Sequence, residues 1–164
     1  MIFIALGANM DSIVGKPTDT LLKAIEVLAA QEIRVAKVSA FYSTPAWPDP
    51  AAPSFVNAVI AVETQLPPAE LLGLLHDVEA RFGRQRSIAN APRPLDLDLL
   101  DYEGHIERGW PLLPHPRVGE RAFVLVPLAD VAPGWKHPVS GVMISQLIAA
   151  LPQETKDAVI PIRL

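Results

Sequence analysis

The hydrophobic residues of this chain recur with two different spacings, and the alternation between these spacings predicts the order of its secondary structure. Apolar or alternating runs typical of strands lie at residues 2–8, 33–44, 54–64 and 95–100. Apolar residues three or four apart, typical of amphipathic helices, lie at residues 18–31 and 68–82. The order strand, helix, strand, strand, helix, strand predicts a ferredoxin-like split βαβ core. This is an α/β (α+β) fold with an antiparallel sheet and its helices on one face.

Proline and glycine mark where these elements end. We expect Gly7 to end the first strand, Pro45 to stop the second, which has room for a bulge, and Gly83 to terminate the second helix. The stretch "PAWPDPAAP" holds four prolines in nine residues, which excludes regular structure and predicts a stiff surface loop. Loops of this kind often carry function.

The remaining third of the chain is expected to pack around this core as a C-terminal elaboration, with a helix near residues 144–151. Half of the 164 residues are hydrophobic, which is enough for one compact core. We therefore expect residues 1–164 to form a single domain.

Composition and charge exclude several classes of protein. The chain has no cysteine, so disulfides and thiolate metal sites are excluded, and any metal ligand is oxygen or imidazole. A net charge of −4 argues against bulk attraction to nucleic acid. No apolar run approaches the roughly 20 residues that span a bilayer, and the start "MIFIAL" lacks the basic residues of a secretion signal. We expect a cytoplasmic monomer that acts on small molecules, without nucleic-acid or membrane partners.

The fourth strand carries the first sign of chemistry, in the stretch "PRPLDLDLL". Because strand side chains alternate between faces, Asp96 and Asp98 should share one face about 7 Å apart. Two acids in one partly enclosed place repel each other, so a positive partner is expected. Four arginines lie within 13 residues immediately before this pair: Arg81, Arg84, Arg86 and Arg93.

Paired carboxylates next to arginines are the groups that Mg²⁺ and a polyphosphate require. Magnesium binds one or two carboxylates together with phosphate oxygens and water, and arginine grips phosphate at two points. The residues alone leave a second interpretation open, in which the acids line the wet face of a half-exposed strand and the arginines form a solvated helix end. Aspartate is nevertheless a poor strand former, so two of them here need a reason.

Three other kinds of residue are candidates for ligand binding. His115, held between two prolines, could bind a ligand or cap a backbone group in a turn. Asn57 lies in an apolar strand, where its amide could read a flat heteroaromatic ring or clasp a neighbouring loop. Aromatic residues that could sandwich such a ring, or simply belong to the core, are Phe55, Phe123, Tyr42 and Trp47.

These residues stand in motifs that resemble one known family. The motifs are "ALGAN", "FYSTP", "FVNAV", "VEARFGRQR", "PRPLDLDLL" and "LPHPRVGERAFVLVPLADVAP", and they extend over nearly the whole chain. "LDLDLL" followed some 15 residues later by "LPHPR" and "RAFVL" is the specific part. The chain resembles the 6-hydroxymethyl-7,8-dihydropterin pyrophosphokinases (2-amino-4-hydroxy-6-hydroxymethyldihydropteridine diphosphokinases) of folate biosynthesis.

The resemblance implies a ferredoxin-like fold and transfer of the β,γ-diphosphate of ATP to the pterin hydroxymethyl oxygen, with release of AMP. It implies that Asp96 and Asp98 hold two Mg²⁺ ions and that Arg84 and Arg93 neutralise the transferred group. The implied ATP-binding residues are His76, Glu79, Arg86, Leu99, His115 and Arg121. The implied pterin-binding residues are Thr44, Pro45, Phe55, Asn57 and Phe123.

The chain departs from the family pattern around its arginine-rich loop. Pro94 replaces a more usual threonine, which removes a hydroxyl and an amide donor. Asn90 or Ala91 stands where some relatives have a tryptophan that closes over the pterin, and Trp47 of the other loop is a candidate substitute. Two other hypotheses remain, a different Mg²⁺-dependent phosphoryl or nucleotidyl transferase and a catalytically silent binding module. The retained acids and arginines speak against the silent module.

Overall fold

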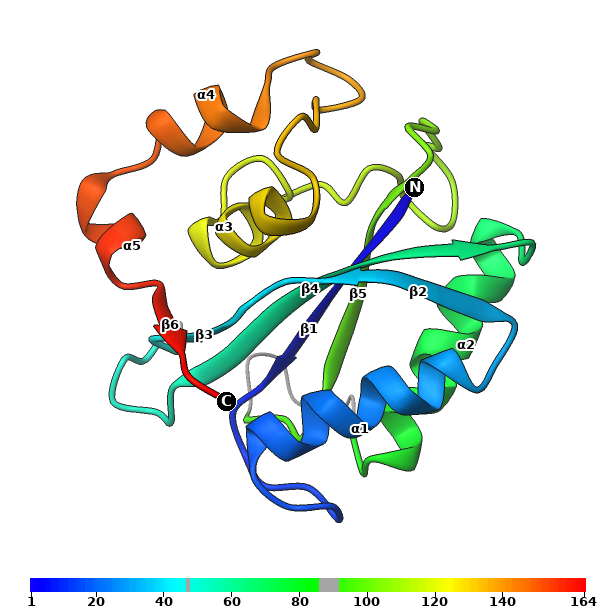
Figure 1. Cartoon of the computed structure of the whole chain (residues 1–164), viewed down its shortest axis with the longest axis vertical. Helices are drawn as coiled ribbons and strands as arrows, with labels where there is room; N and C mark the ends of the chain where they lie inside the picture. Colours follow the sequence, from blue (N-terminus) through cyan, green and yellow to red (C-terminus); the bar gives the residue numbers. More distant parts are fainter. Residues whose placement is uncertain (47, 86–91) are drawn as a thin grey trace.

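The computed structural model describes residues 1–46, 48–85 and 92–164, and its first seven elements follow the predicted order, with the second predicted strand divided into two. They are β1 (Ile2–Ala8), α1 (Pro17–Ala29), β2 (Ile33–Val38), β3 (Phe41–Thr44), β4 (Phe55–Thr64), α2 (Pro68–Arg81) and β5 (Asp96–Tyr102). The strands form one antiparallel sheet in the order β5-β1-β4-β3, and β2 pairs with the other half of β4. The ferredoxin-like core is thereby confirmed (Figure 1).

The predicted second strand is split in two. A register shift between Val35 and Lys37 interrupts β2, and Ser39 and Ala40 separate β2 from β3, although both pair with β4. The side-chain hydroxyl of Ser39 accepts the Val59 backbone N–H at 2.9 Å, so a polar side chain replaces part of the ladder at the break. The irregularity that the sequence predicts is therefore real, and it divides the strand.

Helices α1 and α2 cover one face of the sheet, and the strand alternation explains why. Leu21 and Leu28 of α1 and Leu71 and Leu75 of α2 are fully buried. They pack against the even-numbered residues of β1 and β4, such as Ile4. Gly83, with a φ of +91°, follows the last turn of α2, as expected of a helix terminator.

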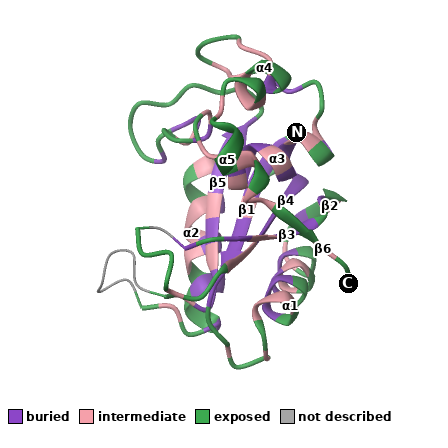
Figure 2. Cartoon of the chain, turned by 90° about the vertical axis from the view of Figure 1, so that its left-hand side faces the viewer, coloured by how far each residue is buried: buried purple, intermediate pink, exposed green. Residues whose placement is uncertain are grey.

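The C-terminal third covers the opposite face. It forms α3 (Ala122–Val131), α4 (Ile144–Ala149), α5 (Gln153–Asp157) and a short strand β6 (Ile160–Ile162) that pairs with the outer edge of β3. A second buried cluster joins α3 and α4 to the odd-numbered residues of β1 and β4, such as Phe3 and Val59, and to Leu100 of β5. Figure 2 shows the buried strands between these helical layers, with exposed residues on their outer surfaces. Helix α4 is confirmed, whereas α3, α5 and β6 are not among the elements expected from sequence.

Two aspartates tie this second layer to the sheet. Asp101 of β5 is buried and accepts the Trp135 indole N–H at 2.8 Å and the Gly104 backbone N–H at 2.9 Å. Asp130 of α3 accepts the Tyr42 hydroxyl at 2.7 Å, and burial together with this bond raises the pKa of Tyr42 to about 12. Both bonds cross from α3 or its C-terminal loop to a strand and so fix the distance between the layers.

Among the described residues, no helix combines the length and the apolar character needed to cross a membrane.

We predict that Asp101→Ala lowers the free energy of unfolding by roughly 1–3 kcal/mol, because it leaves the buried Trp135 N–H without an acceptor. Urea denaturation measures the change, and Asp77→Ala, on an exposed site of α2, is the matched control. Equal stability of the two variants would contradict a supporting role for Asp101.

Candidate active site

The two acids of β5 share one face, and this face is the one that α3 covers. Leu97 and Leu99 point toward α1 and α2 into the first core cluster, which leaves Asp96 and Asp98 on the opposite side. Both carboxylates line a cavity of about 740 Å³. The predicted alternation is therefore confirmed, and it directs both acidic side chains into an enclosed space.

The floor of this cavity is a row of residues across three adjacent strands. Gly7 of β1 pairs with Asp96 on one side and with Asn57 of β4 on the other. Adjacent strands lie about 5 Å apart, so the acid and the amide are about 10 Å apart at their backbones. A Cβ on Gly7 would stand 2.8 Å from the Asn57 Oδ1 atom, so glycine keeps the floor open between them.

The acid end of the cavity is held by arginines from the loop that precedes β5. Arg84 forms ion pairs with Glu79 at 2.5 Å and with Asp96. Arg93 reaches the other oxygen of Asp96 at 3.2 Å. Burial alone would lower the pKa of the Arg84 guanidinium, but the charges of Asp96 and Glu79 raise it. Asp96 is thus neutralised in this structure by two arginines that the sequence placed beside it.

Glu79 supports this cluster from below the sheet. Its side chain is 1% exposed, and Oε2 accepts both the Arg84 guanidinium and the Leu97 backbone N–H, the latter at 2.9 Å. The carboxylate therefore joins α2, the edge of β5 and the arginine loop. It does not line the cavity.

Asp98 is in a different electrostatic position from Asp96. It forms no ion pair or side-chain hydrogen bond with any residue that the structure describes. Burial, followed by the charges of Asp96 and Glu79, raises the pKa of Asp98 to about 7, and Arg121 and Arg84 offset this only in part. Burial beside a second carboxylate therefore disfavours the ionised form of Asp98, and a cation bound next to it would favour that form.

These donors fit magnesium better than a metal held by protein alone. In residues 1–46, 48–85 and 92–164, no group of three or more histidine or acidic side chains is arranged around a common point. Mg²⁺ accepts one or two carboxylates when phosphate oxygens and water complete its shell. Asp96 and Asp98 thus suit an ion that arrives together with a phosphate ligand.

His115 and Arg121 approach the acids from the segment that precedes α3. The Nδ1 atom of His115 accepts the Arg117 backbone N–H at 3.1 Å, and burial and the Arg121 charge lower the pKa of the imidazole. A neutral ring with an accepting Nδ1 carries its proton on Nε2, so one donor is left for a ligand. The turn-capping role and a ligand role are therefore compatible.

Arg121 is the N-cap residue of α3 and lines the cavity. Its guanidinium carbon lies 5.5 Å from the centre of the Phe123 ring. Burial and the charge of Arg117 lower the pKa of Arg121, while Asp98 and Asp96 act in the opposite direction. Both its position and its charge direct it to an anion bound near the acids.

All five residues predicted to bind the pterin line the other end of the cavity. Asn57 is 8% exposed, and its Nδ2 atom donates to the Thr44 hydroxyl at 2.6 Å. The clasp that the sequence allows is therefore present, and it orients an amide whose other atoms face the cavity. Pro45, Phe55 and Phe123 supply apolar surface around it.

Of the predicted nucleotide residues that the structure describes, Arg121 lines the cavity, whereas His76, Glu79, Leu99 and His115 do not. His76 is half-buried on α2, and the Leu99 side chain is 4% exposed in the core beneath α1 and α2. Leu97 donates its N–H away from β1, and by alternation the N–H of Leu99 points to the same edge. Leu99 can therefore meet a ligand through its backbone. Arg86, Trp47, Asn90 and Ala91 lie outside the described residues.

Sequence reasoning missed Asn9, which joins three loops of the site. Its Oδ1 atom accepts the Arg93 N–H at 2.8 Å, its own N–H donates to the Arg93 carbonyl at 3.1 Å, and Nδ2 donates to the Pro53 carbonyl at 3.3 Å. Asn9 is 4% exposed. A buried asparagine directly after a strand was the available signal, since such an amide must find partners.

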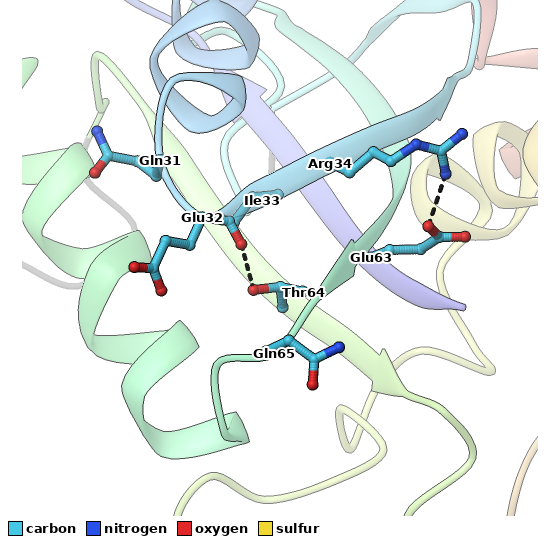
Figure 3. A pocket seen from close by; sticks show the side chains of 7 residues that line it. All are labelled: Gln31, Glu32, Ile33, Arg34, Glu63, Thr64 and Gln65. Atoms are coloured by element: carbon cyan, nitrogen blue, oxygen red, sulfur yellow. Dashed lines mark hydrogen bonds and ion pairs between the residues drawn. The ribbon is translucent and has the colours of Figure 1, made fainter.

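A separate hollow of about 400 Å³ lies between the end of α1 and the ends of β2 and β4 (Figure 3). Its charged pair, Arg34 and Glu63, is closed at 2.7 Å and exposed, and the Thr64 hydroxyl donates to the Glu32 carbonyl at 2.6 Å. Arg34 and Glu63 thus pair with each other, and the Thr64 hydroxyl is bonded to the backbone. We therefore take the larger cavity, which contains Asp96 and Asp98, as the candidate active site.

Known proteins that are similar to this chain belong to one family. Residues 3–133 match the model of the 7,8-dihydro-6-hydroxymethylpterin-pyrophosphokinase family. The chain belongs to this family. A 2-amino-4-hydroxy-6-hydroxymethyldihydropteridine pyrophosphokinase of Methylorubrum extorquens is 44% identical over 133 residues, which cover 80% of this chain and 82% of that protein. The Synechocystis protein of the same name is 40% identical over 147 residues, which cover 88% of this chain and 73% of that protein.

Solved structures agree on the fold of this pyrophosphokinase. A crystal structure of HPPK-DHPS in complex with substrates superposes with a TM-score of 0.66 at 13% identity, over 91% of this chain and 44% of that one. The wild-type Plasmodium falciparum HPPK-DHPS with pteroate superposes with a TM-score of 0.65 at 14% identity, over 90% of this chain and 41% of that one. The chain therefore spans less than half the length of these solved chains.

We predict that Asp98→Asn stabilises the metal-free protein above pH 7. The folded pKa lies above the unfolded value of 3.8, so ionisation of Asp98 opposes folding, and this penalty grows as the pH rises toward about 7. The gain at pH 8 should be roughly 1–3 kcal/mol, after allowance for screening of a half-buried group, and should vanish near pH 4.

Thermal unfolding at the two pH values measures this gain, with Asp77→Asn as the control for loss of a surface charge. A gain that is the same at both pH values would show that Asp98 titrates as an ordinary carboxyl.

Proposed function

We propose that this chain transfers the β,γ-diphosphate of ATP to the hydroxymethyl oxygen of 6-hydroxymethyl-7,8-dihydropterin, with release of AMP, in folate biosynthesis. The observation that carries the proposal is the row Asp96, Gly7 and Asn57 across three strands. An acid pair that suits the donor and an oriented amide that suits the acceptor share one cavity floor, which supports the proposal. Family membership supports the same assignment.

The acceptor end suits a pterin ring. Asn57 is fixed by Thr44 and can present both a donor and an acceptor to the alternating edge of such a ring. Phe55 and Phe123 line the same end and suit the faces of a flat heterocycle. Binding there would place a substituent on the ring over Gly7, toward the two acids.

The donor end suits the triphosphate. We assign two Mg²⁺ ions to Asp96 and Asp98. When bound, they would neutralise phosphate charge and bring the acceptor oxygen close to the phosphorus under attack. Arg84 and Arg93, now paired with Asp96, are placed to turn to the phosphate oxygens, and Arg121 faces them from α3. Transfer of this kind needs mainly positioning and charge neutralisation from side chains.

We assign the remaining nucleotide contacts to the outer edge of β5. Leu99 would bind through its backbone, and His115 through its Nε2 proton, since its Nδ1 is already bonded. His76 and Arg86 complete the assignment, and Glu79 contributes by holding Arg84 in place.

We further assign residues 1–164 to a single domain that acts as a cytoplasmic monomer on small molecules. The return of β6 to the outer edge of the sheet supports the single domain, because the C-terminal segment and the core then share one sheet.

Incubation of the protein with ATP, Mg²⁺ and 6-hydroxymethyl-7,8-dihydropterin tests the function. AMP and the pterin diphosphate should appear together. ADP or inorganic pyrophosphate would indicate a different transferase, and no nucleotide product would indicate a silent module. Asp98→Ala should lower kcat roughly a hundredfold or more, because a lost metal ligand acts mainly in the transition state. Glu70→Ala, an exposed acid of α2, is the control.

A second experiment tests whether Asn9 acts through Arg93. Arg93→Ala should slow the single-turnover step more than it weakens ATP binding. Asn9→Ala should cost roughly ten- to a hundredfold in that step, because displacement of a phosphate-directed guanidinium is costly. In the Arg93→Ala background the same change should cost little more.

Asn9→Asp, which keeps the oxygen that accepts the Arg93 N–H, should retain more activity than Asn9→Ala. Losses that multiply in the double variant would assign Asn9 a purely structural role.

A further inference from the structure

The cavity has a wall that lies outside the residues matched by the family model. The match ends at residue 133, whereas the cavity is also lined by Leu151, Pro152, Thr155, Ala158 and Val159. These residues come from α5 and its two flanks. We call residues 151–159 the rear wall.

The rear wall is anchored at both ends. On one side, Leu147, Ile148 and Leu151 pack against the cluster formed with α3. On the other side, β6 pairs with β3, with Ile160 opposite Ser43. Extending this antiparallel register by one residue brings Val159 beside Thr44, which holds Asn57. The rear wall is thus fixed next to the acceptor end of the cavity, remote from the acids on β5.

The rear wall offers a ligand apolar surface rather than hydrogen-bond donors, so it would select a ligand by its shape. Leu151, Ala158 and Val159 are half-buried and offer only apolar side chains. The Thr155 hydroxyl donates to the Pro152 carbonyl at 2.8 Å, so its proton is already used. Asn57 and Thr44 on the floor would form the hydrogen bonds to a ligand, and the rear wall would limit the size of the ligand that fits.

We propose that residues 151–159 form the back of the acceptor pocket and that Ala158 sets its depth, so that this segment determines which pterins bind. The inference rests on the proposed function. The backbone of Ala158 lies in the right-handed region, with φ −77° and ψ −10°, so a larger side chain is compatible with it. A larger side chain there would enter the space of the ring.

The test is the binding of 6-hydroxymethylpterin to the protein (residues 1–164) in the presence of an ATP analogue and Mg²⁺, measured by the fluorescence of the pterin. Ala158→Phe should weaken pterin binding roughly ten- to a hundredfold, since an overfilled pocket excludes its ligand. Ala149→Phe makes the same change on an exposed residue of α4 and should stay within about twofold of the parent protein. Affinity for the ATP analogue, measured without pterin, should be unchanged in both.

Thr155→Phe is the second variant if Ala158→Phe does not fold, because Thr155 lines the cavity from an exposed position. Pterin affinity at the parent level in a folded Ala158→Phe or Thr155→Phe would overturn the inference, as would a parallel loss of ATP-analogue affinity. If the parent protein itself binds no pterin and releases no AMP, the proposed function fails. If the parent protein is active and the variants bind normally, only the rear wall is refuted.

Discussion

The pleat of β5 is the constraint on which the site depends. It sends Leu97 and Leu99 into the core and thereby forces Asp96 and Asp98 into the same cavity. Two adjacent acids there are tolerable only with positive charge nearby. The protein supplies this charge unequally, with two arginines on Asp96 and no direct partner for Asp98 among the described residues. The site is therefore half neutralised before any ligand arrives.

The two faces of the sheet have different duties. The face under α1 and α2 is an apolar core. The charged exception is Glu79 of α2, which is buried and accepts a hydrogen bond from the Arg84 guanidinium. The face under α3 combines an apolar cluster with the cavity. Asp101 and Asp130 hold the layer above that face at a set distance. On the side of the cavity, the loops that follow β1 and precede β5 meet where Asn9 bonds to the backbone of Arg93, whose guanidinium reaches Asp96.

Local pattern predicted much of this arrangement. Element order, the shared face of the acids and the nearby arginines all follow from spacing along the sequence, and the pterin-side residues follow from resemblance. Helix α3 was missed because "AFVLVPLADV" is apolar except for Asp130 and contains Pro127, so its periodicity is uninformative. The role of Asn9 was missed because its partners lie 44 and 84 residues away. Leu99 was assigned by position, which does not distinguish a side chain from a backbone contact.

The short strand β6 also affects how the molecule behaves toward its own copies. An uncovered strand edge is a template on which a second chain can add and start aggregation. Here the outer edge of β3 is covered by three residues with Pro161 in the middle, and proline cannot donate to a further ladder. The strand that covers this edge directly follows the C-terminal residues that line the cavity. Removal of β6 would uncover the outer edge of β3 and leave it open to pairing with a second copy of the chain.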